Sequence, residues 1–134
     1  MRYLLPVILA SILALPAAAQ TERRYDAAGR NAGRAETRGD TTRFHDAQGR
    51  SAGRAEQRGD TTRYYDAAGR STGRSELGRH YDAQGRGTGR IETRDGTSRT
   101  YDAQGRSTGR SETRGDTTRL YDAQGRSTGR IERR

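Results

Sequence analysis

Residues 45–64 read HDAQGRSAGRAEQRGDTTRY, and near-copies of this unit fill the chain from residue 25 onward. Self-similarity at a fixed period indicates that one small structural element is used repeatedly. Few aliphatic residues and high charge are typical of disordered chains, whereas a constant phase through every copy indicates an ordered repeat. The six copies begin at Tyr25, His45, Tyr65, Tyr81, Tyr101 and Tyr121.

The third copy is the shortest, and its length separates a strand repeat from a helical one. Residues 77–80 read LGRH where other copies carry eight residues such as TRGDTTRL. A helix would place tyrosines twenty residues apart on nearly opposite faces, so no aromatic stripe would form. Removing two residues from each of two paired strands shortens a hairpin by one pleat and keeps later side chains on their faces. The deletion therefore predicts β-hairpins.

Two kinds of turn alternate along the chain. The DAQGR sequence at residues 46–50 is typical of a type I turn followed by a bulge at Gly, with the Asp carboxylate accepting backbone N–H groups. Gly-Asp or Asp-Gly marks the return turns at 39–40, 59–60, 95–96 and 115–116. We expect an all-β fold of tandem β-hairpins with about twelve short strands. They would form an elongated antiparallel meander, a single twisted sheet that is open, curled or solenoid-like.

Pairing across the Asp-to-Arg turn predicts which side chains share a face. If Asp46 lies opposite Arg50, then His45 faces Ser51 and, in a regular ladder, residue 43 faces residue 53. Tyr or His then shares a face with the Gly, over which an aromatic ring can lie. The acids and the other arginines occupy the opposite face. The Tyr face also carries a small or aliphatic position, at Ala35, Ala55, Ser75, Ile91, Ser111 and Ile131.

The N-terminus has the pattern of a secretory signal peptide. A basic start, an apolar stretch at 4–15 and three alanines at 17–19 predict cleavage after residue 19. The organisation predicted is a signal peptide over 1–19, a short lead over 20–24 and a six-repeat β-hairpin domain over 25–134. We expect the protein in the periplasm or outside the cell, with no membrane span after signal removal. The chain has no cysteine and therefore no disulfide framework.

Charge predicts an anionic partner. Every basic residue is Arg; with 26 of them against 17 acids, the net charge is +9. The guanidinium fork binds carboxylate, sulfate and phosphate in bidentate fashion, so the partners expected are anionic polysaccharide, lipopolysaccharide or extracellular nucleic acid. The alternative is an internal charge ladder in which arginines pair with acids of the repeat. The predicted polyanion-binding residues are Arg34, Arg54, Arg74, Arg90, Arg110, Arg130, Arg133 and Arg134.

Catalysis is not expected, because the polar residues recur in near-identical surroundings and form no singular constellation. No cofactor or metal is expected either. The sequence thus predicts a non-catalytic exported repeat protein presenting an Arg-rich β surface to envelope or matrix polymers. The alternative is a structural or protein-interaction element that self-associates or docks through sheet edges. Aliphatic and Phe side chains are too few after residue 19 for an ordinary core: Phe44, Leu77, Ile91, Leu120 and Ile131.

The segment TTRYYDAAGR at residues 61–70 resembles the YD repeats of Rhs-type proteins, in which successive hairpins coil into a large β shell. The unit is also similar, more weakly, to the hairpin repeats of MORN-type proteins. Both resemblances imply β-hairpins. Rhs shells use many more repeats than the six found here, so the resemblance implies no enclosed cargo.

Overall fold

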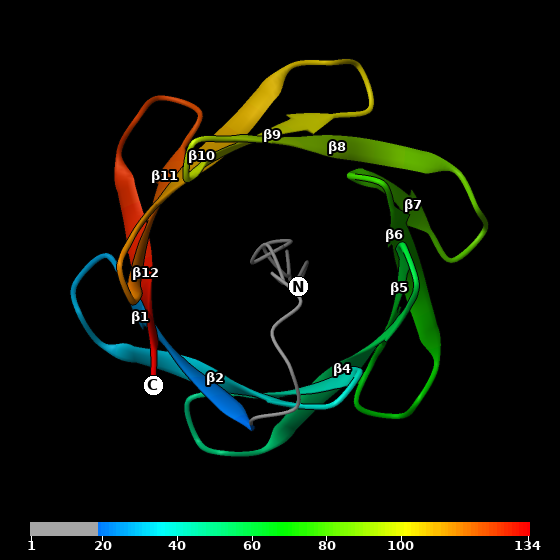
Figure 1. Ribbon diagram of the computed structural model, residues 1–134, viewed down its shortest axis with the longest axis horizontal. Helices are drawn as coiled ribbons and strands as arrows, with labels where there is room; N and C mark the ends of the chain where they lie inside the picture. The colour runs from blue at the N-terminus through cyan, green and yellow to red at the C-terminus, as the bar shows by residue number, and fades with distance from the viewer. Residues whose placement is uncertain (1–18) are drawn as a thin grey trace.

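The computed structural model describes residues 19–134, which form a closed barrel of antiparallel β-strands (Figure 1). Apart from residue 19, the predicted signal peptide lies outside the described residues. The described part of the chain includes no helix with the length and apolarity needed to span a membrane. The strands are β1 (Gln20–Asp26), β2 (Asn31–Arg38), β3 (Thr41–His45), β4 (Ser51–Arg58), β5 (Thr61–Tyr65), β6 (Ser71–Glu76), β7 (Arg79–Asp82), β8 (Gly87–Arg94), β9 (Thr97–Asp102), β10 (Ser107–Arg114), β11 (Thr117–Asp122) and β12 (Ser127–Arg133).

The all-β class and the hairpins are confirmed, but the elongated meander and the solenoid are wrong. Strands follow one another around the barrel in chain order, and β1 pairs with β12 to close the ring. At this seam the amide of Arg134 donates to the carbonyl oxygen of Thr21 at 2.8 Å, and the amide of Thr21 donates back at 3.3 Å. The described barrel therefore leaves no strand edge unpaired.

A bulge in every unit explains the closure. Phe44 pairs with Gly53 and His45 pairs with Ser51, so Ala52 has no partner on β3. Such a bulge bends its strand and increases the local twist. The same bulge lies beside a Gly in all six units, and a repeated bulge-and-glycine pattern curves a sheet into a barrel.

The Gly beside each bulge allows two strands to approach closely. Gly53 has φ +130°, and a Cβ at this position would clash with the carbonyl oxygen of Tyr65 on β5. Any other residue would have to adopt an unfavourable backbone conformation and push β4 away from β5.

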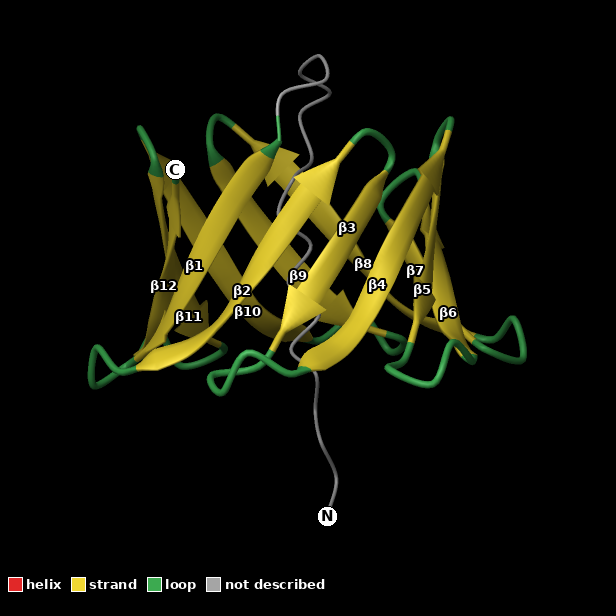
Figure 2. Ribbon diagram, turned by 90° about the horizontal axis from the view of Figure 1, so that it is seen from below, coloured by secondary structure: helices red, strands yellow, loops and turns green. Residues whose placement is uncertain are grey.

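The DxxGR loops form as the sequence predicts. Within residues 46–50 the amide of Asp46 donates to the Arg50 carbonyl at 2.9 Å, and Gly49 has φ +82°. The Asp46 carboxylate accepts the amides of Gln48 and Arg50, each at 2.9 Å. These larger loops lie at one end of the barrel and splay outward, whereas the two-residue turns lie at the other end (Figure 2).

The shortened third unit confirms the argument from its deletion. Strands β6 and β7, which are joined by a Leu77-Gly78 turn, have 6 and 4 residues, whereas β4 has 8. Tyr81 keeps its place on the outer face, since its ring stacks with Arg74 at 4.5 Å as the other tyrosines stack with theirs. Leu77 adopts φ +48° and is 77% exposed, so this tight turn forces a strained conformation on a bulky residue.

The predicted lead, residues 20–24, forms most of β1 and so belongs to the barrel wall. Strand β1 pairs with β12 in the same register in which β3 pairs with β2. In three of the units two hydroxyls pair across the hairpin, as Thr37 does with Thr42 at 2.9 Å. At the seam an ion pair, Arg133 Nε to Glu22 Oε1 at 3.3 Å, takes their place.

We expect Gly53→Ala to lower the free energy of unfolding by about 2 kcal/mol or more, because alanine resists the positive φ and clashes with the Tyr65 carbonyl. Urea denaturation followed by far-UV circular dichroism measures this. The control is Gly87→Ser, at a position with open space around it and Ser in most other units. Equal stabilities for the two variants would contradict the close approach.

We expect Glu22→Arg to destabilise the barrel by about 2 kcal/mol, because it breaks the half-buried pair and places a third cation near Arg133 and Arg24. Amide hydrogen exchange should rise first in β1 and β12. The matched control is the charge swap Glu22→Arg with Arg133→Glu, which should recover most of the loss. A swap no more stable than the single variant would show that the pair does not hold the seam.

Candidate functional site

The outer wall carries a repeated row of one acid, two arginines and one aromatic residue. Direct cross-strand partners place Glu56, Arg63, Arg74 and Tyr81 side by side on β4, β5, β6 and β7. Equivalent rows begin at Glu36, Glu76, Glu92, Glu112 and Glu132, and in the last of these His45 replaces the tyrosine.

The second arginine of each row is held by its neighbours. The guanidinium of Arg54 lies 4.3 Å from the centre of the Tyr65 ring, and its Nε donates to Glu56 at 2.9 Å. A cation over an aromatic ring and a charge-assisted hydrogen bond both favour this fixed position. The hydrogen bond from the Arg34 side chain likewise holds the pKa of Glu36 below its ordinary value.

These contacts correct the predicted faces. The tyrosines share the outer face with the arginines, while the Gly and the small or aliphatic position face inward. The bulge is the reason: Arg43 pairs with Arg54 rather than with Gly53, so residues beyond the bulge exchange faces. Phe44, not Arg43, is the residue that lies opposite the bare Gly.

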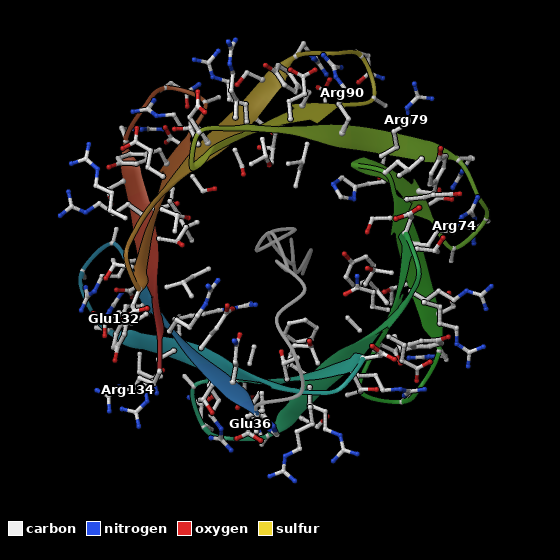
Figure 3. All side chains as sticks on the ribbon, in the orientation of Figure 1. Glu36, Arg74, Arg79, Arg90, Glu132 and Arg134 are labelled. Carbon is white, nitrogen blue, oxygen red and sulfur yellow. The ribbon has the colours of Figure 1, made fainter. Side chains whose placement is uncertain are left out.

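The eight predicted polyanion-binding arginines do not form one surface. Arg133 points inward to Glu22, and Arg134 is exposed at the chain end. The other six are the second arginines of the rows, and Arg74 and Arg90 are seen on the outer wall in Figure 3. Five of the six pair with a Glu: Arg34, Arg54, Arg90, Arg110 and Arg130. Five stack on a Tyr: Arg54, Arg74, Arg90, Arg110 and Arg130. For these residues the internal charge ladder describes the structure.

The first arginine of each row is the one that stays available. Their side chains are exposed and form no hydrogen bond or ion pair with any residue in 19–134, whereas their backbones lie within the strand ladders. Neighbours around the barrel lie roughly 12 Å apart, given two strand spacings and the stagger between units. Sequence reasoning missed them because the deciding neighbours lie on the adjacent strands. The only local signal is a TTR triplet, which ends at three of the six residues. We call them the outer arginine belt: Arg23, Arg43, Arg63, Arg79, Arg99 and Arg119.

The loop arginines are also engaged. Arg50 Nε donates to Asp46 Oδ2 at 2.9 Å, and every DxxGR loop repeats this pair. The backbone amide of Arg50, followed by its side chain, holds the pKa of Asp46 below the ordinary value. The same causes act on the other loop aspartates: Asp26, Asp66, Asp82, Asp102 and Asp122.

No protein-family model and no curated protein sequence matches this chain. Within residues 19–134 no three His, Cys, Asp or Glu side chains gather in a way that could hold a metal ion.

The loop aspartates predict acid sensitivity. Their pKa values are lower in the folded state than in the unfolded chain, so their stabilising contribution is complete above the unfolded pKa near 4 and is lost as pH falls through the folded value. We expect the melting temperature to fall between about pH 5 and pH 2. Asp66→Asn should destabilise at pH 7 and converge with the original protein at low pH. Asp60→Asn, at an exposed return turn, removes the same charge and serves as control; an identical pH profile for both variants would contradict the assignment.

Proposed function

We propose that this protein is a non-catalytic, exported binding module whose outer arginine belt binds anionic polymers of the cell envelope or matrix. The observation that carries the proposal is that six regularly spaced arginines on the outer wall have no anionic partner within residues 19–134. A guanidinium that forms no internal ion pair keeps all its donors for sulfate, carboxylate or phosphate groups. We therefore propose the six belt arginines as the polyanion-binding residues, instead of the eight arginines expected from sequence.

The arrangement suits an extended polymer better than a small anion. Belt residues recur on every second strand around the whole circumference, so a flexible polyanion can meet several in succession. Each contact with an exposed charge is weak by itself, and summed contacts bring strong salt dependence through counterion release. The fixed second arginines and tyrosines provide a rigid wall beside the belt.

The second candidate, a scaffold acting through sheet edges, has no unpaired edge to use in the described barrel. Self-association would therefore need another surface or an opened seam. Light scattering over a range of protein concentrations tests it, and growth in mass with concentration would favour this role.

We expect the protein to be retained on heparin and released by a few hundred millimolar salt, with a steep decline in affinity as salt rises. Arg63→Gln with Arg99→Gln should lower the salt concentration needed for elution and flatten the dependence of log affinity on log salt. Affinity chromatography and calorimetry in parallel measure both quantities.

The matched control is Arg70→Gln with Arg106→Gln, which removes the same net charge from two loop arginines already paired with aspartates. If only net charge matters, both double variants will lose affinity equally and the belt assignment fails. If the original protein ignores heparin and lipopolysaccharide at low salt, polyanion binding itself is wrong.

A further inference from the structure

One position varies in every unit while the surrounding residues repeat. The residue just before the conserved Tyr or His differs in all six copies, although TTR or a close variant precedes it in most of them. A position with only a structural role in identical units would be expected to hold similar residues. The six are Arg24, Phe44, Tyr64, His80, Thr100 and Leu120, and we call them the inner ring.

All six side chains face the interior at equivalent places in the wall. Phe44 lies opposite Ala35 on one side and Gly53 on the other, and Tyr64 lies opposite Ala55 and Gly73. At the level of the ring, each strand between two ring residues therefore contributes only Gly and a small or aliphatic residue. Larger side chains two strands apart can meet across it, as Arg24 does with the Phe44 ring at 5.2 Å.

The side chains of residues 19–134 line the interior and do not fill it. Twelve tilted strands enclose a diameter of roughly 22 Å between backbones, wider than the eight-stranded barrels that side chains just fill. The buried hydrophobic residues of the described chain are Ala35, Ala55 and Ile131, while inward Tyr64 and Leu120 keep part of their surface accessible. The inward side chains of the described residues stop well short of the barrel axis (Figure 3).

Arg24 gives this lining a single unpaired cation. Away from the loops, the inward charged residues of the described strands are Glu22, Arg24 and Arg133, and the first pairs with the last. Nε of Arg24 is buried and has no hydrogen-bond partner within residues 19–134, and the same is true of Nε2 of His80. Burial lowers the pKa of His80, so His80 is neutral at pH 7 and adds no charge.

We infer that the barrel interior binds a small organic anion with a planar aromatic part, an aryl carboxylate, at the sector formed by Arg24, Phe44 and Tyr64. The guanidinium binds the carboxylate through its Nη donors, which form no hydrogen bond or ion pair within residues 19–134. The rings of Phe44 and Tyr64 supply stacking surface, since aromatic pairs gain from offset contact beyond their buried area. Thr100 on β9 lies across the barrel from Phe44, and Leu120 on β11 lies two strands from Arg24. Neither offers a charge, so the carboxylate is directed to Arg24.

Equilibrium dialysis of the purified protein against 2-naphthoate tests this inference, with the neutral 2-naphthamide as comparison. We expect one saturable site that prefers the carboxylate, and Arg24→Gln should weaken naphthoate binding about tenfold or more without changing naphthamide binding. Phe44→Thr should weaken the binding of both compounds, because it removes an aromatic stacking surface. The fold should be preserved, since Thr occupies the same position at residue 100.

The matched control is Arg23→Gln, one residue earlier on β1 but on the outer wall. It should leave naphthoate affinity within twofold while weakening heparin retention. Arg24→Gln should weaken naphthoate binding and leave heparin retention nearly unchanged. Equal losses of naphthoate affinity in the two variants, several equivalents bound per chain, or no saturable binding at millimolar naphthoate would overturn the inference. Circular dichroism melts confirm that each variant remains folded, and the polyanion proposal stands or falls separately on the heparin measurement.

Discussion

The close approach of two backbones at the glycine of each unit is the constraint on which the barrel depends. Gly53 admits the carbonyl of Tyr65 where any side chain would stand, and the adjacent Ala52 bulges out of the ladder. The bulge bends the sheet in the same sense in every unit, and so the ends of the sheet meet. It also exchanges the faces of the residues beyond it, which brings the tyrosine at the start of each unit that has one against an arginine on the outer wall. Shape and surface chemistry thus share one local cause.

Closure of the barrel compensates for the small number of apolar side chains. The described chain buries few apolar side chains and could not stabilise an exposed sheet edge by core packing. Pairing β1 with β12 satisfies the last backbone groups, and the Glu22–Arg133 ion pair occupies at the seam the place that a hydroxyl pair takes in three of the hairpins. Ladders, turns and charge pairs then share the stabilisation that a core supplies in most domains.

Local chemistry made much of this predictable from sequence. The DxxGR loops and the even deletion in the third unit indicate hairpins because turn geometry and strand period act over a few residues. The bulge at Ala52 was not predictable, since an unpaired residue is defined only by its partner strand, and one missed residue reverses a whole face. For the same reason the sequence did not show which arginines are free of internal contacts. Arg54 and Arg63 look alike in sequence, but Glu56 and Tyr65 hold only Arg54. The resemblance to YD repeats stays a prediction.

The sequence by itself determined the unit: its hairpin, its turns, its strand length and its excess of arginine, all properties of neighbouring residues. Only the tertiary structure decided that the sheet closes, that the lead residues 20–24 form a wall strand, which arginines remain exposed, and that the position that differs in all six units lines the interior. Those outcomes depend on pairings between strands and, at the seam, between opposite ends of the chain. Closure, for example, depends on the backbone curvature summed over six units, which cannot be read from the residues of any single unit.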